Sequence, residues 1–401
     1  MSCFYRVPLC VPYWNRATYR KAIRSFALGR IIDGPELSEL SSLVIETLGV
    51  EDAVLCGSGS LALEIALRRC EVQPDDEVII PTFCCTAVVP PILAVGALPV
   101  LADVGEDLNI AAETIEPVVT KKTKAIIVPH LFGNPADIHT IVAFAHERSI
   151  RVIDDAAQAL GATIDGQLAG SFGDAGVLSF GNEKVCFGIG GGAVVSRKKD
   201  FFNGSSKIEL ARVKSSLAVR SFLSTLIWRR WRRWTFAVEA MLSRAKTAGP
   251  DSPPTPYGKE AMANLRAAVA LSLMQTLGEN IAARRARVHS YQRLLRTEER
   301  LELIPHEKGS ACLTQVVRIL PKRCGADLSV HLIQTLGSAG YEIQGSYVPI
   351  HLLSGYEQWV RKPPGNAERV WSDLIELPCE PDVSFDDVEQ IASIVKQVVN
   401  S

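Results

Sequence analysis

The stretch from Arg151 to Val195 limits most strongly what this chain can fold into. It begins with the sequence RVIDD, a short apolar run that ends in Asp154 and Asp155. A strand covered on both faces is apolar throughout, so this pattern predicts a buried parallel strand with polar chemistry at its carboxyl end. A second apolar run at 176–180 follows a glycine-rich turn, and a third at 193–195 follows three glycines.

Lys184 lies between these last two runs, five residues after Ser179. Pyridoxal phosphate (PLP) requires a lysine that bonds to its aldehyde and a carboxylate that faces its pyridine nitrogen. The carboxylate keeps that nitrogen protonated so that the ring can accept electrons, and a neutral lysine can move the substrate proton. Spacing alone leaves two interpretations open. Asp155 and Lys184 form such a site, or they are an ordinary strand-end acid and a surface lysine facing solvent.

A resemblance separates these interpretations. The order D-D-A-A-Q-A-L-G-A, S-F-G-D, S-F-x-x-x-K and a glycine run resembles the sugar aminotransferases of the DegT/StrS type. The resemblance implies a fold-type I PLP enzyme that aminates keto-sugars attached to nucleotides. It also implies that Asp155 holds the ring nitrogen, Gln158 lies near the ring hydroxyl, Ser179 binds the phosphate and Lys184 bonds to the cofactor.

Strands that alternate with helices between 52 and 195 predict a mostly parallel, doubly wound sheet. The resemblance implies the seven-stranded type of sheet of fold-type I PLP transferases in a large domain, with a smaller α+β carboxy-terminal domain. We expect an N-terminal lead-in at 1–27, the large PLP-binding domain at 28–211, a Trp/Arg-rich amphipathic insertion and linker at 212–256, and an interdomain helix with the small domain at 257–401.

The sequence G-S-G-S at 57–60 follows a short predicted strand and opens a helix. The free N–H groups and the dipole of a helix N-terminus attract anions, although this motif alone is more typical of an ordinary N-cap. The resemblance implies that Ser60 and Leu61 serve the cofactor phosphate. Ligands of doubly wound sheets bind beyond the carboxyl ends of the strands, where Ser60, Asp155 and Lys184 are all expected.

The chain departs from the family pattern at two places. Most members carry an aromatic residue over the cofactor ring where this chain has Cys85, so either Phe83 reaches the ring or a smaller side chain suffices. Many members also carry G-Y-N-x-R, whose asparagine reaches the neighbouring subunit's cofactor phosphate. Here the sequence before a long predicted helix at 262–295 is P-Y-G-K-E-A-M, with Lys259 near the asparagine's position. The resemblance implies a homodimer, but this departure leaves contact between subunits at the cofactor open.

The sequence Y-V-P-I-H-L at 347–352 resembles the family's substrate-facing loop. Tyr347 and His351 are therefore candidate substrate contacts, and a hydrogen-bonded structural histidine is the alternative for His351. His130, in isolation, is more typical of a core or loop histidine than of a catalyst.

Residues 212–246 differ from the rest of the chain because tryptophan and arginine gather there. A helix here would place arginines 229, 232 and 233 opposite an apolar face made of Ile227, Trp231, Trp234, Val238, Met241 and Leu242. A basic amphipathic helix is typical of a membrane-surface segment, so peripheral membrane contact through 215–245 is one interpretation. The alternative is a helix that packs on its own protein or on a subunit partner.

Composition and charge limit the classes of protein to which this chain can belong. A chain of 401 residues can form one large and one small domain that share a cofactor cleft. The net charge of -1 argues against a nucleic-acid binder, and ten cysteines without C-x-x-C spacing indicate reduced thiols and no zinc or other metal site. The sequence has neither an export signal at its N-terminus nor an apolar run of ~20 residues, so we expect a cytoplasmic protein, peripheral at the inner membrane surface if the insertion binds lipid.

The sequence as a whole predicts a PLP-dependent aminotransferase. We expect it to move an amino group from an amino acid, glutamate being the expected donor, to a keto-sugar for polysaccharide, lipopolysaccharide or secondary-metabolite biosynthesis. A sugar dehydratase is one alternative, but that branch of the family replaces the lysine with histidine and Lys184 is present. A membrane-surface binding or regulatory protein on an inactive aminotransferase scaffold is the other.

Overall fold

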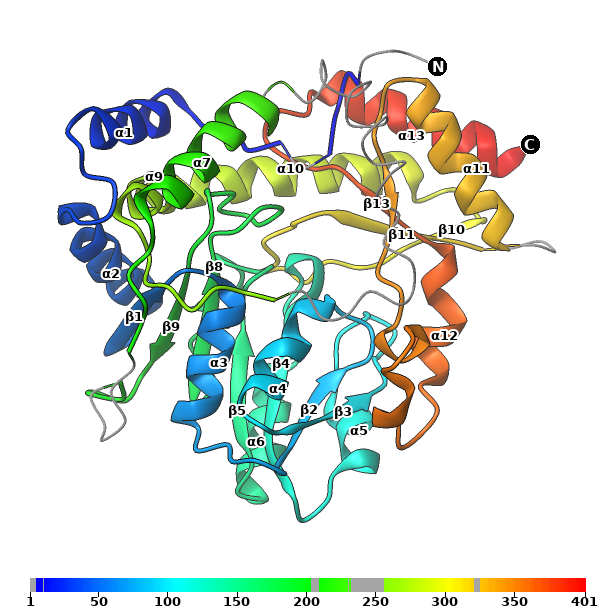
Figure 1. Cartoon of the computed structure of the whole chain (residues 1–401). Coiled ribbons are helices and arrows are strands. Elements are labelled where there is room, and N and C mark those ends of the chain that lie inside the picture. Colours follow the sequence, from blue (N-terminus) through cyan, green and yellow to red (C-terminus); the bar gives the residue numbers. More distant parts are fainter. Residues whose placement is uncertain (1–4, 10, 203–208, 230, 232–255, 321–324) are drawn as a thin grey trace.

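The computed structural model describes residues 5–9, 11–202, 209–229, 231, 256–320 and 325–401. These residues form a large seven-stranded sheet and a smaller four-stranded sheet. Figure 1 shows the large sheet with its helices in the lower part of the molecule, while helix α10 runs across the upper part and the carboxyl terminus lies at the upper right. A two-stranded hairpin, β6 (Thr163–Ile164) and β7 (Gln167–Leu168), completes the strands of the large domain.

The large sheet has the strand order β1-β9-β8-β5-β4-β2-β3. All neighbours from β8 to β3 pair in parallel, whereas β9 runs antiparallel to both β8 and β1. The predicted mostly parallel, doubly wound sheet is therefore confirmed. Its strands are β1 (Asp52–Cys56), β2 (Glu77–Pro81), β3 (Leu98–Ala102), β4 (Thr123–Pro129), β5 (Arg151–Asp155), β8 (Ala175–Ser179) and β9 (Gly192–Ser196).

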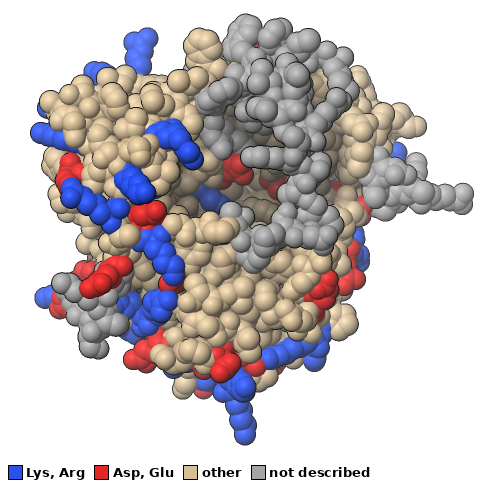
Figure 2. All heavy atoms as spheres, in the orientation of Figure 1, with Lys and Arg blue, Asp and Glu red and all other residues tan. Residues whose placement is uncertain are grey.

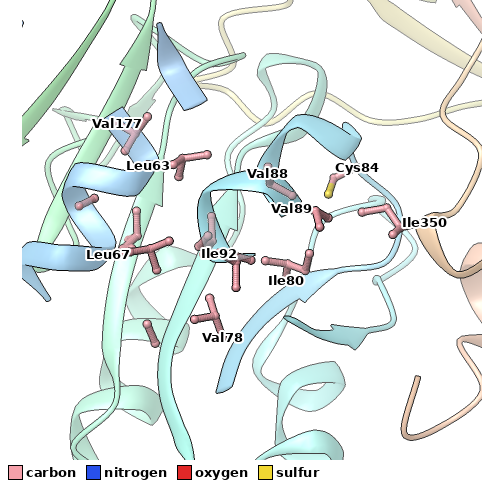
Figure 3. Packing of buried hydrophobic residues seen from close by; sticks show 14 of the residues in the cluster. Leu63, Leu67, Val78, Ile80, Cys84, Val88, Val89, Ile92, Val177 and Ile350 are labelled. Carbon is pink, nitrogen blue, oxygen red and sulfur yellow. The ribbon is translucent and has the colours of Figure 1, made fainter. Parts of the chain in front are cut away.

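Helices cover both faces of this sheet, which explains why its strands are apolar throughout rather than alternating. Ile79 and Val152 pack with the residues of α6, whereas Ile80 and Ile153 pack in the cluster that contains α3 and α4. Figure 3 shows Leu63, Leu67 and Ile92 of these helices close to Ile80 and Val177 of the sheet. The helices of this domain are α2 (Pro35–Leu48), α3 (Gly59–Arg69), α4 (Val89–Ala94), α5 (Ala112–Ile115) and α6 (Ile138–Glu147).

The long helix predicted at 262–295 is two helices, α9 (Asn264–Gln275) and α10 (Leu277–Leu295). Thr276 separates them with φ -115° and ψ 18°. Its hydroxyl donates back to the carbonyl of Ser272 or Leu273, a local bond that competes with helix continuation. The α9 helix is buried from Asn264 to Met274 and packs on α1 (Arg16–Ala27) and α2.

The small sheet is antiparallel with the order β10-β11-β13-β12. Helices α11 and α13 pack on it through a core that includes Tyr341, Val317 and Ile391. Its elements are β10 (Leu301–Leu303), β11 (Gln315–Ile319), α11 (Gly325–Ser338), β12 (Gln344–Gly345), β13 (Leu374–Leu377) and α13 (Phe385–Asn400).

The Trp/Arg-rich insertion is described only at its beginning. It starts with α7 (Ser215–Ser224) and a π-helical turn at 225–229, and Phe222 of α7 stacks on Trp14. Ile227 and Trp231, both on the predicted apolar face, are 55% and 61% exposed. The other residues of that face, Trp234, Val238, Met241 and Leu242, lie outside the described residues, as do arginines 232 and 233. No helix in the described part of the chain has the length and apolar character needed to span a membrane.

The carboxy-terminal half returns to the large sheet through residues 350–373. Helix α12 (Gly365–Val370) begins with the backbone N–H groups of Asn366 and Ala367, which donate to the Asp103 carboxylate at 2.8 and 2.9 Å. Further along the sheet edge, Arg361 donates to both carboxylate oxygens of the buried Glu77, one of them at 2.9 Å. This bond lowers the pKa of Glu77. The pair therefore joins β2 to the carboxy-terminal half.

We predict that Glu77→Gln destabilises the protein by roughly 2 kcal/mol at neutral pH, because a hydrogen-bonded charge is lost. The folded-state pKa of Glu77 lies below its ordinary value of 4.5, so its stabilisation is complete above the ordinary value and falls as the pH drops through the folded value. Urea unfolding should give a large difference between the two proteins at about pH 7 and a smaller one at about pH 4. Glu113→Gln, on the exposed side of α5, is the control. An equal difference at both pH values would contradict the role of the ionised pair.

Candidate active site

A cavity of about 220 Å³ lies at the carboxyl ends of β5 and β8. It is where a doubly wound sheet places its ligand. Figure 2 shows one face of the molecule with a hollow near its middle, and both acidic and basic atoms are visible in that hollow. The lining residues are Ser58, Gly59, Ser60, Leu63, Cys84, Cys85, Ala87, Val88, Pro129, Asp155, Ala157, Gln158, Val177, Ser179, Gly181, Lys184, Gly190 and Gly191.

The two acids that end β5 have different partners because adjacent residues of a strand face opposite sides of the sheet. Asp155 is 4% exposed and lines the cavity. Asp154 is completely buried and bonds to His130 at 2.7 Å and to the N–H groups of Gly170 and Phe172. Asp154 thus anchors the loop that follows β5, and only Asp155 is available to a ligand.

His130 helps to fix this arrangement. Its Nδ1 accepts the N–H of Ala136 at 2.9 Å, so the ring proton lies on Nε2 and is donated to Asp154. Both side chains are completely buried. His130 therefore orients the end of the strand from behind, and it is not among the residues that line the cavity.

Burial raises the pKa of Asp155. The N–H of Ala157, which donates to Asp155 at 2.9 Å, and the charge of Lys184 act in the opposite direction. A buried carboxylate in this state gains from a cationic hydrogen-bond donor, because a bound cation offsets the cost of removing the charge from water. A protonated pyridine nitrogen is such a donor.

The serine-rich end of the cavity depends on close backbone contacts that a Cβ atom would block. Ser58 caps α3 by accepting the N–H of Leu61 at 3.2 Å. A Cβ on Gly59 would lie 3.0 Å from the Cβ of Ser179, and one on Gly192 would lie 2.6 Å from the Ser58 carbonyl. These glycines let the loop before α3 approach β8 and β9, so that three serine hydroxyls and several backbone amides face one space.

Each predicted phosphate ligand has a definite position there. Ser60 lines the cavity, and its hydroxyl donates to the Ala87 carbonyl at 3.3 Å. Ser179 also lines it, and its Oγ accepts the N–H of Gly181 at 3.3 Å. The Leu61 side chain lies in the core instead, and only its N–H, bonded to Ser58, is near this end.

Gln158 and Tyr347 connect the cavity to a second one. The Oε1 of Gln158 accepts the N–H of Phe132, and its Nε2 donates to the Tyr347 hydroxyl at 3.2 Å. Tyr347 packs against Phe83 and Phe132, with ring centroids 6.1 and 6.0 Å away. Phe83 is completely buried in this aromatic group, whereas Cys85 lines the cavity. Of the two residues considered for the position over the ring, Cys85 is the one at the cavity wall.

The second cavity, of about 70 Å³, adjoins the first at Lys184 and Gln158. Three carboxylates line it, from Glu183, Glu376 and Glu380, together with Tyr347 and Arg284. Burial raises the pKa of Glu376 to about 7, and Glu183 and Glu380 add to the effect. The sequence gives no sign of this group, because Glu376 and Glu380 are remote from the cofactor motifs and Glu183 stands beside the more informative Lys184. Their proximity comes from the fold, since β13 and the loop after β8 meet there.

His351 is not among the residues that line either cavity. Its Nδ1 pairs with the Thr82 hydroxyl at 2.6 Å and its Nε2 with Glu368 at 3.0 Å, and it is 7% exposed. These bonds are those expected of a structural histidine, because His351 joins the end of β2 to α12. Tyr347 is the candidate substrate contact that lies at the cavities.

The residues of the first cavity fit PLP. Serine hydroxyls and glycine amides at a helix N-terminus suit a phosphate, a buried carboxylate suits a pyridine nitrogen, and Lys184 supplies the amine. The fold and this cavity together define a PLP-dependent transferase of fold-type I. The DegT/DnrJ/EryC1/StrS aminotransferase family model matches residues 15–396, and the chain belongs to that family of PLP-dependent enzymes.

Two curated relatives and one solved structure illustrate the similarity. A UDP-N-acetyl-3-dehydro-α-D-glucosamine 3-aminotransferase of Acidithiobacillus ferrooxidans is 44% identical over 177 residues, which are 42% of this chain and 47% of that relative. A GDP-perosamine synthase of Caulobacter vibrioides is 27% identical over 91% of both chains. The PLP form of the sugar aminotransferase Spr1654 of Streptococcus pneumoniae has the same fold, with a TM-score of 0.78, 22% identity and 99% of each chain covered.

We predict that Gly59→Ala weakens PLP binding roughly tenfold, because overpacking against Ser179 costs about 1–3 kcal/mol. Titration of cofactor-free protein with PLP, followed by the visible absorbance of the lysine-bound cofactor, measures the change. Gly278→Ala is the matched control, since a Cβ on that glycine of α10 meets nothing within 4 Å. Unchanged PLP affinity in the Gly59 variant would show that the close approach is not needed.

Proposed function

We propose that this aminotransferase moves an amino group from glutamate to the keto group of a nucleotide-linked sugar. The observation that supports this most directly is that Asp155, Ser179 and Lys184, which are remote in sequence from the Ser58–Ser60 loop, line one cavity with it. The catalytic pair is Lys184 and Asp155, and the cofactor ligands are Ser60, Gln158, Ser179 and, through its backbone N–H, Leu61.

When bound, PLP supplies the electron sink for the transfer. Lys184 would hold it through its amine, and the Lys184 Nζ would remove and return the proton of the reacting carbon. The Asp155 carboxylate holds the ring-nitrogen proton, which gives the ring its capacity to accept electrons. Gln158, fixed by the Phe132 N–H, presents its amide at the boundary of the two cavities and positions the ring.

The acceptor sugar is assigned to the second cavity. Lys184 and Gln158 line both cavities, so a carbonyl carbon bound there can reach the reacting amine. The carboxylates of Glu183, Glu376 and Glu380 can accept hydrogen bonds from sugar hydroxyls, and the Tyr347 hydroxyl can bond to the substrate. The names of the two curated relatives specify a UDP-linked amino sugar and GDP-perosamine, which supports a nucleotide-linked substrate.

The assembly and location expected from the sequence are part of the proposal. We expect a cytoplasmic homodimer, as the family resemblance implies, and peripheral membrane contact through 215–245 stays one of two interpretations of that segment. The exposed Ile227 and Trp231 support a contact surface at the start of that segment. A lipid surface and a protein partner both suit such apolar side chains, and co-sedimentation with liposomes distinguishes them.

We predict that Lys184→Ala lowers transamination about 10³-fold or more, since both the covalent link and the proton carrier are lost. PLP-loaded protein is incubated with glutamate and a panel of keto-sugar nucleotides, and mass spectrometry detects replacement of the carbonyl by an amine. Lys199→Ala, at an exposed position after β9, is the control and should retain full activity. Repeated turnover by the Lys184 variant would overturn the assignment, and a product that has only lost water would indicate a dehydratase.

We predict that Asp155→Asn slows the reaction by about 10²–10⁴-fold while the cofactor stays bonded to Lys184. A neutral amide cannot hold the ring-nitrogen proton, so the rate should fall without loss of the visible absorbance band. Single-turnover kinetics with glutamate separate the two effects. Asp165→Asn, in an exposed turn, is the control. A variant with normal turnover would remove Asp155 from the mechanism.

A further inference from the structure

Arg266 is a buried cation whose charge has no ion-pair partner among the described residues. It lies in the first turn of α9 and is 9% exposed. Its Nη1 donates to the Gly57 carbonyl and its Nη2 to the Ser221 hydroxyl, both at 3.3 Å. Its Nε is buried and has no hydrogen-bond partner in the described structure. Buried charges are normally paired, so this arrangement calls for an anion that the chain itself does not supply there.

The position of Arg266 within α9 adds to the free-energy cost of burying its charge. The N-terminus of a helix carries partial positive charge, which favours acids and disfavours cations in the first turn. The first turn of α9 contains no acid. Burial lowers the pKa of Arg266, and Glu260 only partly opposes this without forming an ion pair in the described residues. A ligand anion nearby would offset both effects.

The neighbouring backbone belongs to the serine-rich end of the cavity. Gly57, which Arg266 holds, directly precedes the loop of Ser58 and Gly59. On the other side, a Cβ on Gly190 would lie 3.4 Å from the guanidinium carbon. Gly190 lines the cavity and has a φ of 101°, which glycine adopts readily. The guanidinium therefore lies behind the cavity wall at Gly190 and holds the residue that precedes the Ser58 loop, and Arg266 is not among the residues that line the cavity.

Two neighbouring cations, Lys259 and Arg68, already have a carboxylate partner. Lys259, near the place of the family's phosphate-binding asparagine, bonds to Glu64 at 2.9 Å. Arg68 and Tyr257 bond to the same carboxylate. Lys259 and Arg68 therefore share a carboxylate, whereas Arg266 has none among the described residues.

We propose that Arg266 is a positioning residue for the cofactor phosphate. It holds the Gly57 carbonyl and supports the turn at Gly190, so that the amides and hydroxyls of the loop face the phosphate. Its unpaired charge attracts the phosphate dianion through the thin glycine wall, where the low dielectric increases the interaction. This inference rests on the proposed placement of PLP in the first cavity.

The test compares PLP with pyridoxal, which has the same ring and aldehyde but no phosphate. Cofactor-free wild type, Arg266→Met and Arg266→Lys are titrated with each ligand, and the visible absorbance of the Lys184-bound ligand gives the dissociation constant. We expect Arg266→Met to weaken PLP binding by roughly tenfold or more and pyridoxal binding by less than about twofold. Arg266→Lys, which keeps the charge, should recover much of the PLP affinity.

Ser221→Ala is the matched control, because it removes one hydrogen-bond partner of Arg266 and leaves the charge in place. It should keep the wild-type preference for PLP over pyridoxal, and thermal unfolding of the cofactor-free variants checks that each is folded. Equal weakening of both ligands in folded Arg266→Met or Arg266→Lys would overturn the inference, because a purely structural role acts on both. Unchanged PLP affinity in Arg266→Met would also overturn it. A wild type that binds neither ligand at Lys184 would overturn the proposed function itself.

Discussion

A carboxylate at the end of a buried parallel strand is the constraint on which this site depends. Asp155 cannot be solvated, because β5 lies in the middle of the large sheet with helices on both faces. The Ala157 N–H and the positive charge of Lys184 favour its ionised form. Asp154 makes the hydrogen bonds to His130 and to the Gly170 N–H, so that Asp155 keeps one side free for a ligand. Of the two acids that end β5, the sheet thus places only Asp155 at the cavity.

The opposite end of the cavity depends on the absence of side chains. Gly59, Gly191 and Gly192 each lie where a Cβ would approach another atom to 3.0 Å or less. Because these positions have no Cβ atoms, α3, β8 and the Gly190 turn can pack closely together. The N-terminus of α3 adds a favourable electrostatic field for an anion. Close approach, rather than any one strong contact, creates this end of the site.

The sequence predicts the parts of the site that follow from strand direction. Parallel strands end on the same side of a sheet, so Ser60, Asp155 and Lys184 could be placed together before any coordinates were known. It does not predict contacts between the two halves of the chain. Glu376 and Glu380 line a cavity with Lys184 only because the small sheet lies there, and the break at Thr276 depends on local bonds that periodicity does not reveal. Arg266 carried a weak signal, as a lone cation in an apolar helix, but its partners at Gly57 and Gly190 come from tertiary packing.

Charge is distributed unevenly along the two cavities, so the two ends of the site suit different chemical groups of a ligand. One end offers hydroxyls, amides and the field of Arg266, and suits an anion. The other end offers three carboxylates, one of which, Glu376, has its pKa raised to about 7, and suits hydroxyl or amine donors. A ligand with a phosphate at one end and a basic nitrogen in its ring satisfies the serines and Asp155 in one orientation. Lys184 lines both cavities, so its amine would face the reactive group of such a ligand beside the cavity that we propose for the sugar.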